Sequence, residues 1–345
     1  MNKLKTILVT GGAGYIGSVV CPKLVKQGYL VKVYDSLIYG KDGISNLIEE
    51  KKVELIVGDI RNKSLLEKSL ENVDCVLHLA AIVGEPLCKK IPDAAHQINE
   101  LSTDSLIQAC KKQKVKRIIY SSTCSNYGSS TELANETTPV QSLSLYSETK
   151  VKSELMILNS KNNEFTSCVL RFATAFGLSP RMRFDLLLQE LIRDAIVDNK
   201  IVVFGPNYWR PLVHVEDIAN ACLKVIESSD EVISGEIFNV GENEENYTKI
   251  QIAELIKQYY PSTSIEIQEL KVDPRNYRVS FDKIKNILNF SITKTVSDGI
   301  KEILNEVNNH NLDPKQSEFS NMCKMTEQVK SYWILDFNTN VKYQL

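Results

Sequence analysis

Short apolar runs alternate with longer amphipathic stretches along the first half of the chain. The apolar runs fall at residues 7–9, 29–34, 53–57, 75–79, 117–121 and 165–170, and helical periodicity is found at about 63–70, 94–112 and 146–160. This alternation predicts an α/β fold with a doubly wound parallel sheet and right-handed crossovers. Because ligands of such sheets bind outside the carboxyl ends of the strands, residues at those ends are the first candidates for a site.

A glycine-rich turn joins the first apolar run to a helical pattern. The sequence Thr-Gly-Gly-Ala-Gly-Tyr-Ile-Gly occupies positions 10–17. Glycines spaced in this way let the backbone turn sharply and approach a pyrophosphate, which the positive end of the next helix also attracts. The same pattern is found in plain tight connections, so its context decides. The residues of the turn predicted to bind a dinucleotide are Gly11, Gly14, Tyr15, Ile16 and Gly17.

An acid follows the second apolar run at the spacing that a dinucleotide site requires. Asp35 lies about 20 residues after the glycines, where a carboxylate accepts hydrogen bonds from a ribose 2′-hydroxyl. The same carboxylate would repel a 2′-phosphate, and the neighbours Ser36 and Leu37 bring no cation. Strand, glycines, helix, strand and acid in this order predict a cofactor site, and the acid favours NAD over NADP.

The next strand ends supply further candidates for the same crevice. Asp59 and Ile60 follow the third run, and Asp59 either contacts the adenine ring or begins a turn. Leu79, Ala80 and Ala81 end the fourth run, where small side chains let the backbone approach a cofactor closely.

Composition narrows the class of protein. With 345 residues, 43% of them hydrophobic, and a net charge of −2, the chain can bury a large core. It has no basic block for nucleic acid or an anionic membrane, no secretory segment at its start and no apolar run of membrane-spanning length, so we expect a cytoplasmic protein. The eight cysteines are dispersed without a C-x-x-C pair, which predicts reduced thiols and no metal site.

Candidate chemistry is found at Tyr146-x-x-x-Lys150. Residues four apart share one face of a helix, and a nearby ammonium would lower the pKa of the phenol from about 10 toward neutrality. The resulting phenolate could take a proton from a sugar hydroxyl, and the hydroxyl of Thr123 could orient the same oxygen. Since this spacing is common on surface helices, its position after a dinucleotide fold is what singles it out.

At this point the chain resembles the extended short-chain dehydrogenase/reductases, specifically the NAD-dependent nucleotide-sugar epimerases and dehydratases. The resemblance implies a Rossmann domain, a smaller C-terminal α/β substrate domain, a tightly held NAD and a nucleotide-diphosphate sugar as substrate. It implies that Thr123, Tyr146 and Lys150 are catalytic, that Tyr146 and Lys150 also touch the cofactor, and that Asn99 belongs to the cofactor site. The matching motifs are 10–17, Asp35, 58–60, 78–81, Asn99, 121–128, Tyr146 with Lys150, 170–177 and 210–217.

The chain departs from this family's pattern beside the catalytic Thr. Dehydratases of the family place an Asp-Glu pair there, whereas this chain has Cys124 and Ser125, neither of which readily protonates a leaving hydroxide. The sequence therefore argues against dehydration. Cys124 either touches the substrate or fills space behind the catalytic residues. Thr174 stands where the family often has Asn at a diphosphate contact.

Arginines are the candidate ligands of the substrate's diphosphate, because guanidinium forks suit phosphate oxygens. Arg210 and Arg275 match family positions that hold these phosphates. The segment 179–185 adds two arginines, of which Arg183 is predicted to face the substrate rather than a surface partner. The segment 83–88 resembles that of family members including GDP-heptose 4-dehydrogenases, and forms either a wall over nicotinamide and sugar or a rigid connection.

We interpret the chain as an NAD-dependent nucleotide-sugar 4-epimerase that acts through a transient 4-keto sugar. The same residues would serve a C4 dehydrogenase or a 4-keto reductase, for example on a GDP-heptose, and a non-catalytic NAD-binding scaffold is the third hypothesis. The predicted domains are 1–177, to which 211–241 returns, 178–305 for the substrate, and a tail at 306–345 that packs on the body or a partner. The family resemblance suggests a homodimer formed by the helices near 94–112 and 146–160.

Overall fold

The computed structural model describes residues 4–268, 274–309, 311–329, 334–336 and 341–343. The strands are β1 (Thr6–Thr10), β2 (Leu30–Asp35), β3 (Val53–Val57), β4 (Cys75–His78), β5 (Arg117–Thr123), β6 (Ser129–Ala134), β7 (Thr166–Phe172), β8 (Thr174–Phe176), β9 (Lys200–Phe204), β10 (Trp209–His214), β11 (Glu236–Val240), β12 (Asn246–Thr248), β13 (Ser264–Gln268), β14 (Asn276–Val279), β15 (Ile334–Asp336) and β16 (Val341–Tyr343). The helices are α1 (Gly17–Lys26), α2 (Ser45–Glu49), α3 (Lys63–Ser69), α4 (Glu85–Lys90), α5 (Pro92–Ala95), α6 (Ser102–Lys112), α7 (Leu145–Asn159), α8 (Leu187–Asp198), α9 (Val215–Glu227), α10 (Asp230–Ile233), α11 (Lys249–Tyr259), α12 (Asp282–Leu288), α13 (Val296–Asn308) and α14 (Asn321–Val329). Short turns are η1 (Asp42–Ile44), η2 (His96–Leu101), η3 (Cys124–Tyr127), η4 (Asn243–Glu245) and η5 (Ser317–Phe319).

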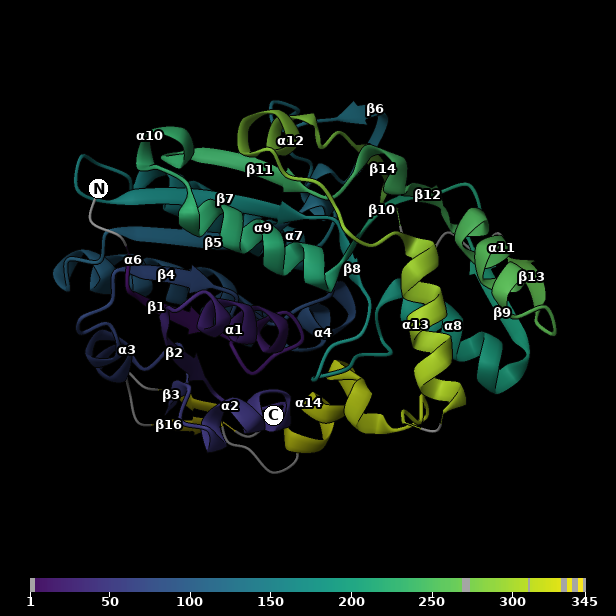
Figure 1. Cartoon of the computed structure of the whole chain (residues 1–345), viewed down its shortest axis with the longest axis horizontal. Coiled ribbons are helices and arrows are strands. Elements are labelled where there is room, and N and C mark those ends of the chain that lie inside the picture. The colour runs from purple at the N-terminus through teal and green to yellow at the C-terminus, as the bar shows by residue number, and fades with distance from the viewer. Residues whose placement is uncertain (1–3, 269–273, 310, 330–333, 337–340, 344–345) are drawn as a thin grey trace.

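The central layer, built entirely from described residues, is a seven-stranded sheet with the order β11-β7-β5-β4-β1-β2-β3. Each adjacent pair of strands is parallel, with Thr10 beside His78 where β1 and β4 end. Helices cover both faces of this sheet (Figure 1). The predicted α/β fold with a doubly wound parallel sheet is confirmed. Strands buried on both faces explain why they are continuous apolar runs in the sequence.

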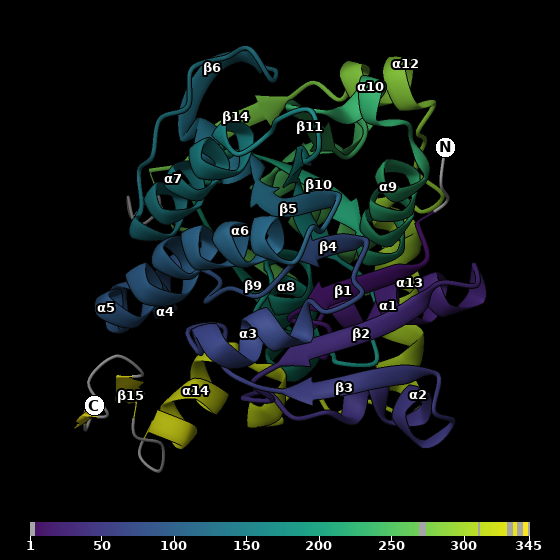
Figure 2. The ribbon, with the colours of Figure 1, turned by 90° about the vertical axis from the view of Figure 1, so that its left-hand side faces the viewer.

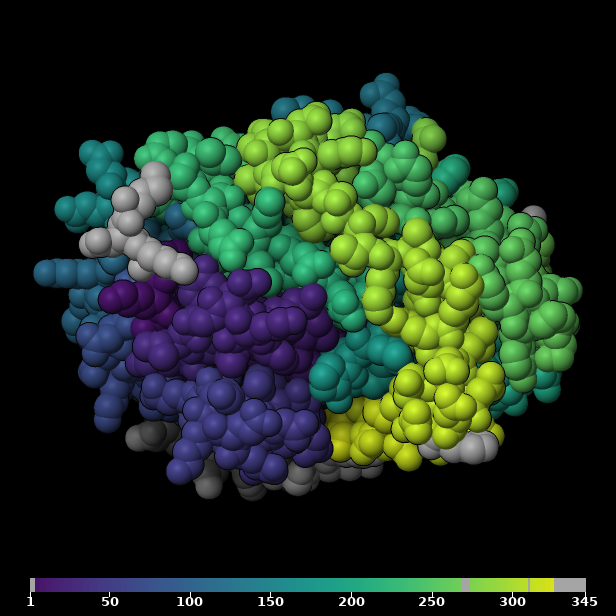
Figure 3. Space-filling model, in the orientation of Figure 1, coloured from purple at the N-terminus to yellow at the C-terminus, as the bar shows by residue number. Residues whose placement is uncertain are grey.

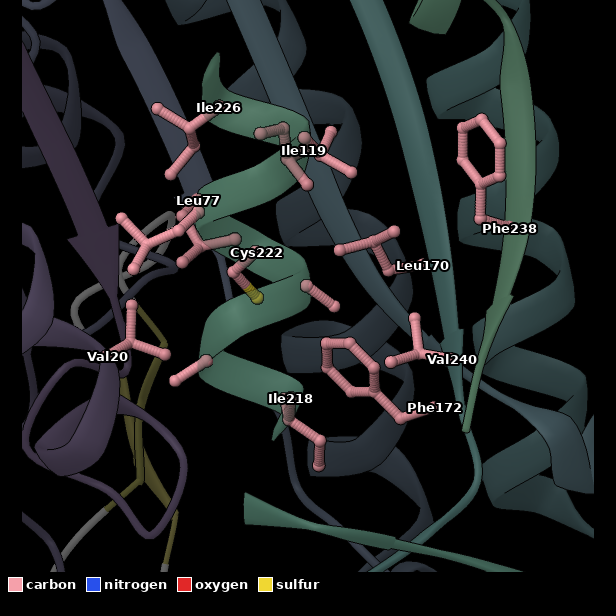
Figure 4. Close-up of a cluster of buried hydrophobic side chains, with 14 of the residues drawn as sticks. Val20, Leu77, Ile119, Leu170, Phe172, Ile218, Cys222, Ile226, Phe238 and Val240 are labelled. Atoms are coloured by element: carbon pink, nitrogen blue, oxygen red, sulfur yellow. The ribbon is translucent and has the colours of Figure 1, made fainter. Parts of the chain in front are cut away.

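The helix α9 fills one face of the sheet with apolar side chains. Ile218, Cys222 and Ile226 of this helix point at Leu77, Ile119 and Leu170 of the strands, and all of them are buried (Figure 4). These α9 side chains recur at the spacing of a helix face, so one side of the helix faces the sheet throughout. The chain returns to this sheet after β10, because α9 leads into β11 at the sheet edge.

A smaller layer of strands and helices lies beyond the carboxyl ends of the sheet. β8, β10 and β12 form a three-stranded sheet, and β9 pairs with β13. A separate apolar core joins α8, α11 and α13 on this side, through residues such as Leu188, Ile256 and Ile300. Together with the main sheet, this arrangement confirms a Rossmann fold with a smaller C-terminal α/β part. The domain boundaries stay a prediction.

One predicted helix is interrupted in the structure. The stretch near 94–112 consists of α5, the π-helical turn η2 and α6. The carbonyl oxygen of Asn99, inside η2, accepts hydrogen bonds from Thr103 Oγ1 at 3.0 Å and Ser153 Oγ at 2.6 Å. Side-chain donors that compete for this carbonyl favour a widened turn, which the apolar pattern does not reveal.

The remaining features are the burial of the cysteines and the packing of the C-terminal tail. Seven of the eight cysteines, all of which lie in the described residues, are buried, and Cys323 is exposed. In the part of the tail that is described, α14 packs on α4. Trp333 and Phe337, which belong to the predicted tail, lie outside the described residues. No helix in the described ranges is long and apolar enough to cross a membrane.

Candidate active site

A cavity of about 540 Å³ opens where the glycine turn, the start of α7 and the segment after β8 meet. It lies at the carboxyl ends of the parallel strands, as expected for this architecture. The structure places Asn99 and Lys150 behind the cavity wall, with 2% and 3% of their surfaces exposed. The predicted residues that line the cavity are Gly11, Gly14, Tyr15, Ile16, Gly17, Asp35, Asp59, Ile60, Leu79, Ala80, Ala81, Thr123, Tyr146, Thr174, Arg183, Arg210 and Arg275.

The glycine turn leaves no room for side chains at two positions. Gly11 has a φ of +72°, and a Cβ there would lie 2.8 Å from the backbone nitrogen of Ala80. A Cβ on Gly17 would lie 2.5 Å from the carbonyl oxygen of Gly11. Glycine is therefore required for the tight turn just before α1, and Gly11, Gly14 and Gly17 line the cavity, which fits the pyrophosphate of a dinucleotide.

Asp35 joins the glycine turn to the end of β2. Its Oδ2 accepts a hydrogen bond from the N–H of Ala13 at 3.0 Å, and its Oδ1 accepts one from the N–H of Leu37 at 2.8 Å. Burial raises the pKa of Asp35, while these backbone donors and the charge of Arg181 act in the opposite direction. The carboxylate thus braces the turn and still faces the cavity, where each oxygen retains capacity to accept from a ribose hydroxyl.

Two other predicted cofactor residues have protein partners for their polar groups. Asp59 forms a two-pronged salt bridge with Arg61, with Oδ2 2.6 Å from Nη2 and Oδ1 2.9 Å from Nε. Asn99 accepts from the N–H of Ile82 at 2.7 Å and donates to the carbonyl of Ile82 at 2.9 Å. Asn99 therefore fixes the wall residues after β4 from behind, and the structure does not bring its side chain to the cavity.

Thr123 and Tyr146 come together in the cavity from different elements. Thr123 ends β5 and caps η3, accepting a hydrogen bond from the N–H of Ser125 at 3.1 Å. Tyr146 lies in the first turn of α7, which Ser144 caps, and its N–H donates to Glu85 Oε2 at 3.2 Å. Lys150 follows one turn later, with Nζ 4.5 Å from the centroid of the Tyr120 ring.

The electrostatics of Tyr146 differ from the expectation based on sequence. Burial raises the pKa of Tyr146, and the cations that counteract this effect are Arg183 and Arg275. Burial also lowers the pKa of Lys150, to about 7. The expected lowering of the phenol pKa by Lys150 is therefore not found in the protein alone: desolvation of Tyr146 dominates, and the cations that oppose it are the two arginines.

The residues after Thr123 have separate locations. Cys124 is fully buried, its Sγ lies 3.2 Å from the carbonyl oxygen of Arg171, and burial raises the thiol pKa well above its usual range. Ser125 lines the cavity, and its Oγ accepts from Thr123 Oγ1 at 3.0 Å. Of the two interpretations of Cys124, filler behind the site is the one that the structure supports.

Arginines converge on the other side of the cavity. Arg210 Nη1 donates to the carbonyl oxygen of Arg275 at 2.7 Å, which holds the two residues beside each other. Arg183 Nε donates to Asp185 Oδ1 at 2.8 Å, and this pairing helps to keep the pKa of Asp185 below its usual value despite burial. Several fixed cations around one cavity suit a diphosphate.

Among the lining residues that sequence reasoning missed, three stand out. Glu85, in the segment predicted as a wall or connection, contacts the backbone of Tyr146 and lies at the start of α4. Arg181 is buried, and its Nη2 has no hydrogen-bond partner among the described residues. Its guanidinium lies 4.7 Å from the Tyr39 ring centroid. The cluster of arginines at 179–185 was the available signal for Arg181. Asn321 of α14 is the third, and no motif marked it.

Comparisons with known proteins agree with this geometry. The family described as "NAD dependent epimerase/dehydratase family" matches residues 7–241. A putative UDP-glucose 4-epimerase of Methanocaldococcus jannaschii is 28% identical, covering 88% of this chain and 99% of that protein. The UDP-glucose 4-epimerase of Lactobacillus helveticus is 30% identical, covering 73% of this chain and 81% of its own length.

A solved structure with the same fold contains both classes of ligand predicted here. The UDP-glucuronic acid 4-epimerase from Bacillus cereus, in complex with UDP-glucuronic acid and NAD, superposes with a TM-score of 0.80 at 27% identity. The match covers 88% of this chain and 99% of that one.

Proposed function

This chain belongs to the NAD-dependent epimerase/dehydratase family, and we propose that it is a nucleotide-sugar 4-epimerase acting on a uridine diphosphate hexose or hexuronic acid. NAD is its cofactor. The observation that carries the proposal is the position of Thr123 and Tyr146 in one cavity with the glycine turn and the arginines. The names of the similar proteins support uridine as the base and C4 as the reacting carbon.

The mechanism assigns a separate task to each side chain at the reacting carbon. Tyr146, as phenolate, takes the proton of the C4 hydroxyl. The Thr123 hydroxyl, which donates to Ser125 Oγ in the structure, turns its proton to the same substrate oxygen and orients it. Bound NAD supplies the acceptor, and later the donor, of the C4 hydride. Arg183 and Arg275 favour the phenolate by opposing the effect of burial, which still leaves the pKa of Tyr146 raised in the protein alone. After rotation of the 4-keto sugar, return of the hydride to the opposite face of C4 and of the proton from Tyr146 to the carbonyl oxygen would invert C4.

Elimination of water is not part of the proposal. Expelling a hydroxide from C6 requires a carboxylic acid beside Thr123, and this chain places buried Cys124 and the hydroxyl of Ser125 there. Glu85 is a carboxylate beside Tyr146, and it accepts a hydrogen bond from the N–H of that tyrosine. Its location supports a role in positioning the start of α7.

The test is to incubate the purified protein and NAD with UDP-glucose and with UDP-glucuronic acid, each deuterated at C4. We expect a product of unchanged mass in which C4 is inverted and the deuterium is retained, with transient label on NAD. The variant Tyr146→Phe should lower turnover by about 10²-fold or more and leave NAD affinity unchanged. Loss of two hydrogens would identify a C4 dehydrogenase, and loss of water would identify a dehydratase; either result contradicts the proposal.

A further inference from the structure

We propose that the C-terminal segment 317–329, here called the cap, forms one wall of the substrate site, and that Asn321 Oδ1 accepts a hydrogen bond from a sugar hydroxyl of the bound nucleotide sugar. The nature of that ligand rests on the proposed function. The cap lies beyond every position that the family resemblance uses, since the last of those is Arg275.

The cap lies against the rest of the molecule at the cavity mouth. Its helix α14 packs on α4, and Met325 is buried in one apolar cluster with Ile82, Leu87 and Cys88. Tyr146 packs against the same cluster. The C-terminal segment, yellow in Figure 3, lies beside the purple segment at the start of the chain along the lower edge of the molecule. Figure 2 shows α14 below α4 from another direction. The cap therefore covers the cavity from the side of α4.

A second set of contacts ties the cap to the arginine-rich segment after β8. The N–H of Phe184 donates to the carbonyl oxygen of Phe319 at 2.8 Å, and the two phenyl rings pack edge to face with centroids 5.8 Å apart. The N–H of Asn321 donates to Asp185 Oδ2 at 2.8 Å, while the other oxygen of Asp185 holds Arg183. These contacts fix the backbone of Asn321 at the cavity wall.

The unpaired side-chain oxygen of Asn321 indicates that a ligand binds there. Asn321 is 94% buried and lines the cavity, yet its Oδ1 has no hydrogen-bond partner among the described residues. A buried acceptor left unpaired is unfavourable, so a donor from a bound molecule would remove that penalty. An amide oxygen accepts from a hydroxyl, and it gives no favourable contact with a phosphate oxygen.

The position of Asn321 selects the substrate sugar over the adenosine of the cofactor. Met325, on the same helix as Asn321, is buried in the apolar cluster against which Tyr146 packs. Asp185 joins Asn321 to Arg183. Asp35, which marks the adenosine ribose, has its hydrogen bonds to the glycine turn and to Leu37 instead. Asn321 therefore belongs to the end of the cavity where the sugar reacts.

The experiment compares Asn321→Ala with Cys323→Ala, a control on the exposed face of the same helix. Each protein is loaded with NAD and titrated calorimetrically with UDP-glucose, UDP-glucuronic acid and GDP-mannose. For the sugar that the unaltered protein binds most tightly, we expect Asn321→Ala to raise Kd about fivefold and Cys323→Ala to leave it unchanged. NAD affinity should be the same in all three proteins.

Several results would overturn the inference: equal sugar affinity in Asn321→Ala, a loss confined to NAD, or no sugar bound by the unaltered protein. Thermal unfolding monitors the fold, and Asn321→Leu, which keeps the branched shape of the side chain and removes the amide, serves as a second variant if alanine destabilises the cap. Binding that depends on Asn321 without any turnover would refute the proposed 4-epimerase activity and leave the assignment of Asn321 standing.

Discussion

Asp35 both stabilises the glycine turn and faces the cavity. Its carboxylate accepts hydrogen bonds from the N–H groups of Ala13 and Leu37, so it holds the glycine turn in place while it faces the cofactor ribose. A phosphate on that ribose would be buried against this carboxylate. The guanidinium of Arg181 is near enough to oppose the effect of burial on the pKa of Asp35.

We expect NAD to bind more than tenfold more tightly than NADP, since repulsion between the carboxylate and the phosphate exceeds about 1.4 kcal/mol. Calorimetric titration of the cofactor-free protein with both nucleotides measures the ratio. The control Asp35→Asn keeps an acceptor and removes the charge, and it should reduce the ratio severalfold. Equal affinities in the unaltered protein would contradict this role of Asp35.

Burial of Lys150 lowers the stability of the folded protein by an amount that depends on pH. Its pKa is about 7 in the folded protein against 10.5 ordinarily, because burial disfavours the cation. Between pH 7 and pH 10.5 the unfolded chain binds more protons than the folded protein. The free-energy cost of burying Lys150 is therefore fully present below pH 7, and it disappears as the pH rises to 10.5. Lys150→Met should therefore raise Tm by about 4 °C or more at pH 7, and by less at pH 10.

Thermal unfolding at the two pH values measures this difference, with Lys152→Met as the control on the exposed side of α7. The Lys152 variant should change Tm by about 1 °C or less at both values. A Lys150→Met protein that is less stable at pH 7 would show that the lysine has a stabilising partner. Turnover should fall in the same variant, since Lys150 is proposed to be catalytic.

At the scale of elements, α7 connects the site to the central sheet through a polar face. Glu154 lies one turn beyond Lys150 and is 2% exposed. It forms a two-pronged salt bridge with Arg171 of β7, with distances of 2.7 Å to Nη2 and 3.0 Å to Nε, and it also bonds Ser122 and Asn126. This network fixes α7 against β5, which ends at Thr123, and β7, which ends two residues before Thr174.

We expect Glu154→Ala to lower the free energy of unfolding by about 3–5 kcal/mol, because it leaves the guanidinium of Arg171 buried without its counter-ion. Denaturant unfolding measures the change. Glu148→Ala is the matched control, since Glu148 is on the same helix, half exposed, and paired with Lys152 at the surface. It should cost about 0.5 kcal/mol or less. Similar losses in the two variants would mean that the buried pair adds no more than a surface one.

For the whole molecule, the face formed by α6 and α7 is the proposed dimer interface. The two helices lie side by side in Figure 2. Leu101, just before α6, and Leu155 of α7 are 59% and 56% exposed. Large apolar side chains left in solvent on neighbouring helices favour a second copy packed against them, and a two-fold axis would create a four-helix bundle.

Light scattering at micromolar concentration should therefore give twice the chain mass of 39.0 kDa. The double variant Leu101→Glu with Leu155→Glu should give the mass of one chain, since charges buried at an apolar interface are strongly unfavourable. Changing Leu133 and Ile287, which are also exposed but lie away from these helices, to Glu should leave the mass unchanged. A single-chain mass for the unaltered protein would refute this interface.

The amino-acid sequence by itself determined the features that depend on neighbours along the chain. Continuous apolar runs gave the parallel strands, the glycine spacing gave the turn before α1, and the four-residue spacing put Tyr146 and Lys150 on one face of α7. These signals are readable because backbone torsion and side-chain periodicity are local properties.

Only the tertiary structure decided which distant groups share an environment. The pKa of Lys150 depends on burial, the partner of Asn99 is the backbone of Ile82, and Asn321 reaches the cavity through Asp185, 136 residues earlier. Desolvation and long-range hydrogen bonds follow from the packing of the complete chain. For that reason no local pattern could place the cap, or show that burial raises the pKa of Tyr146.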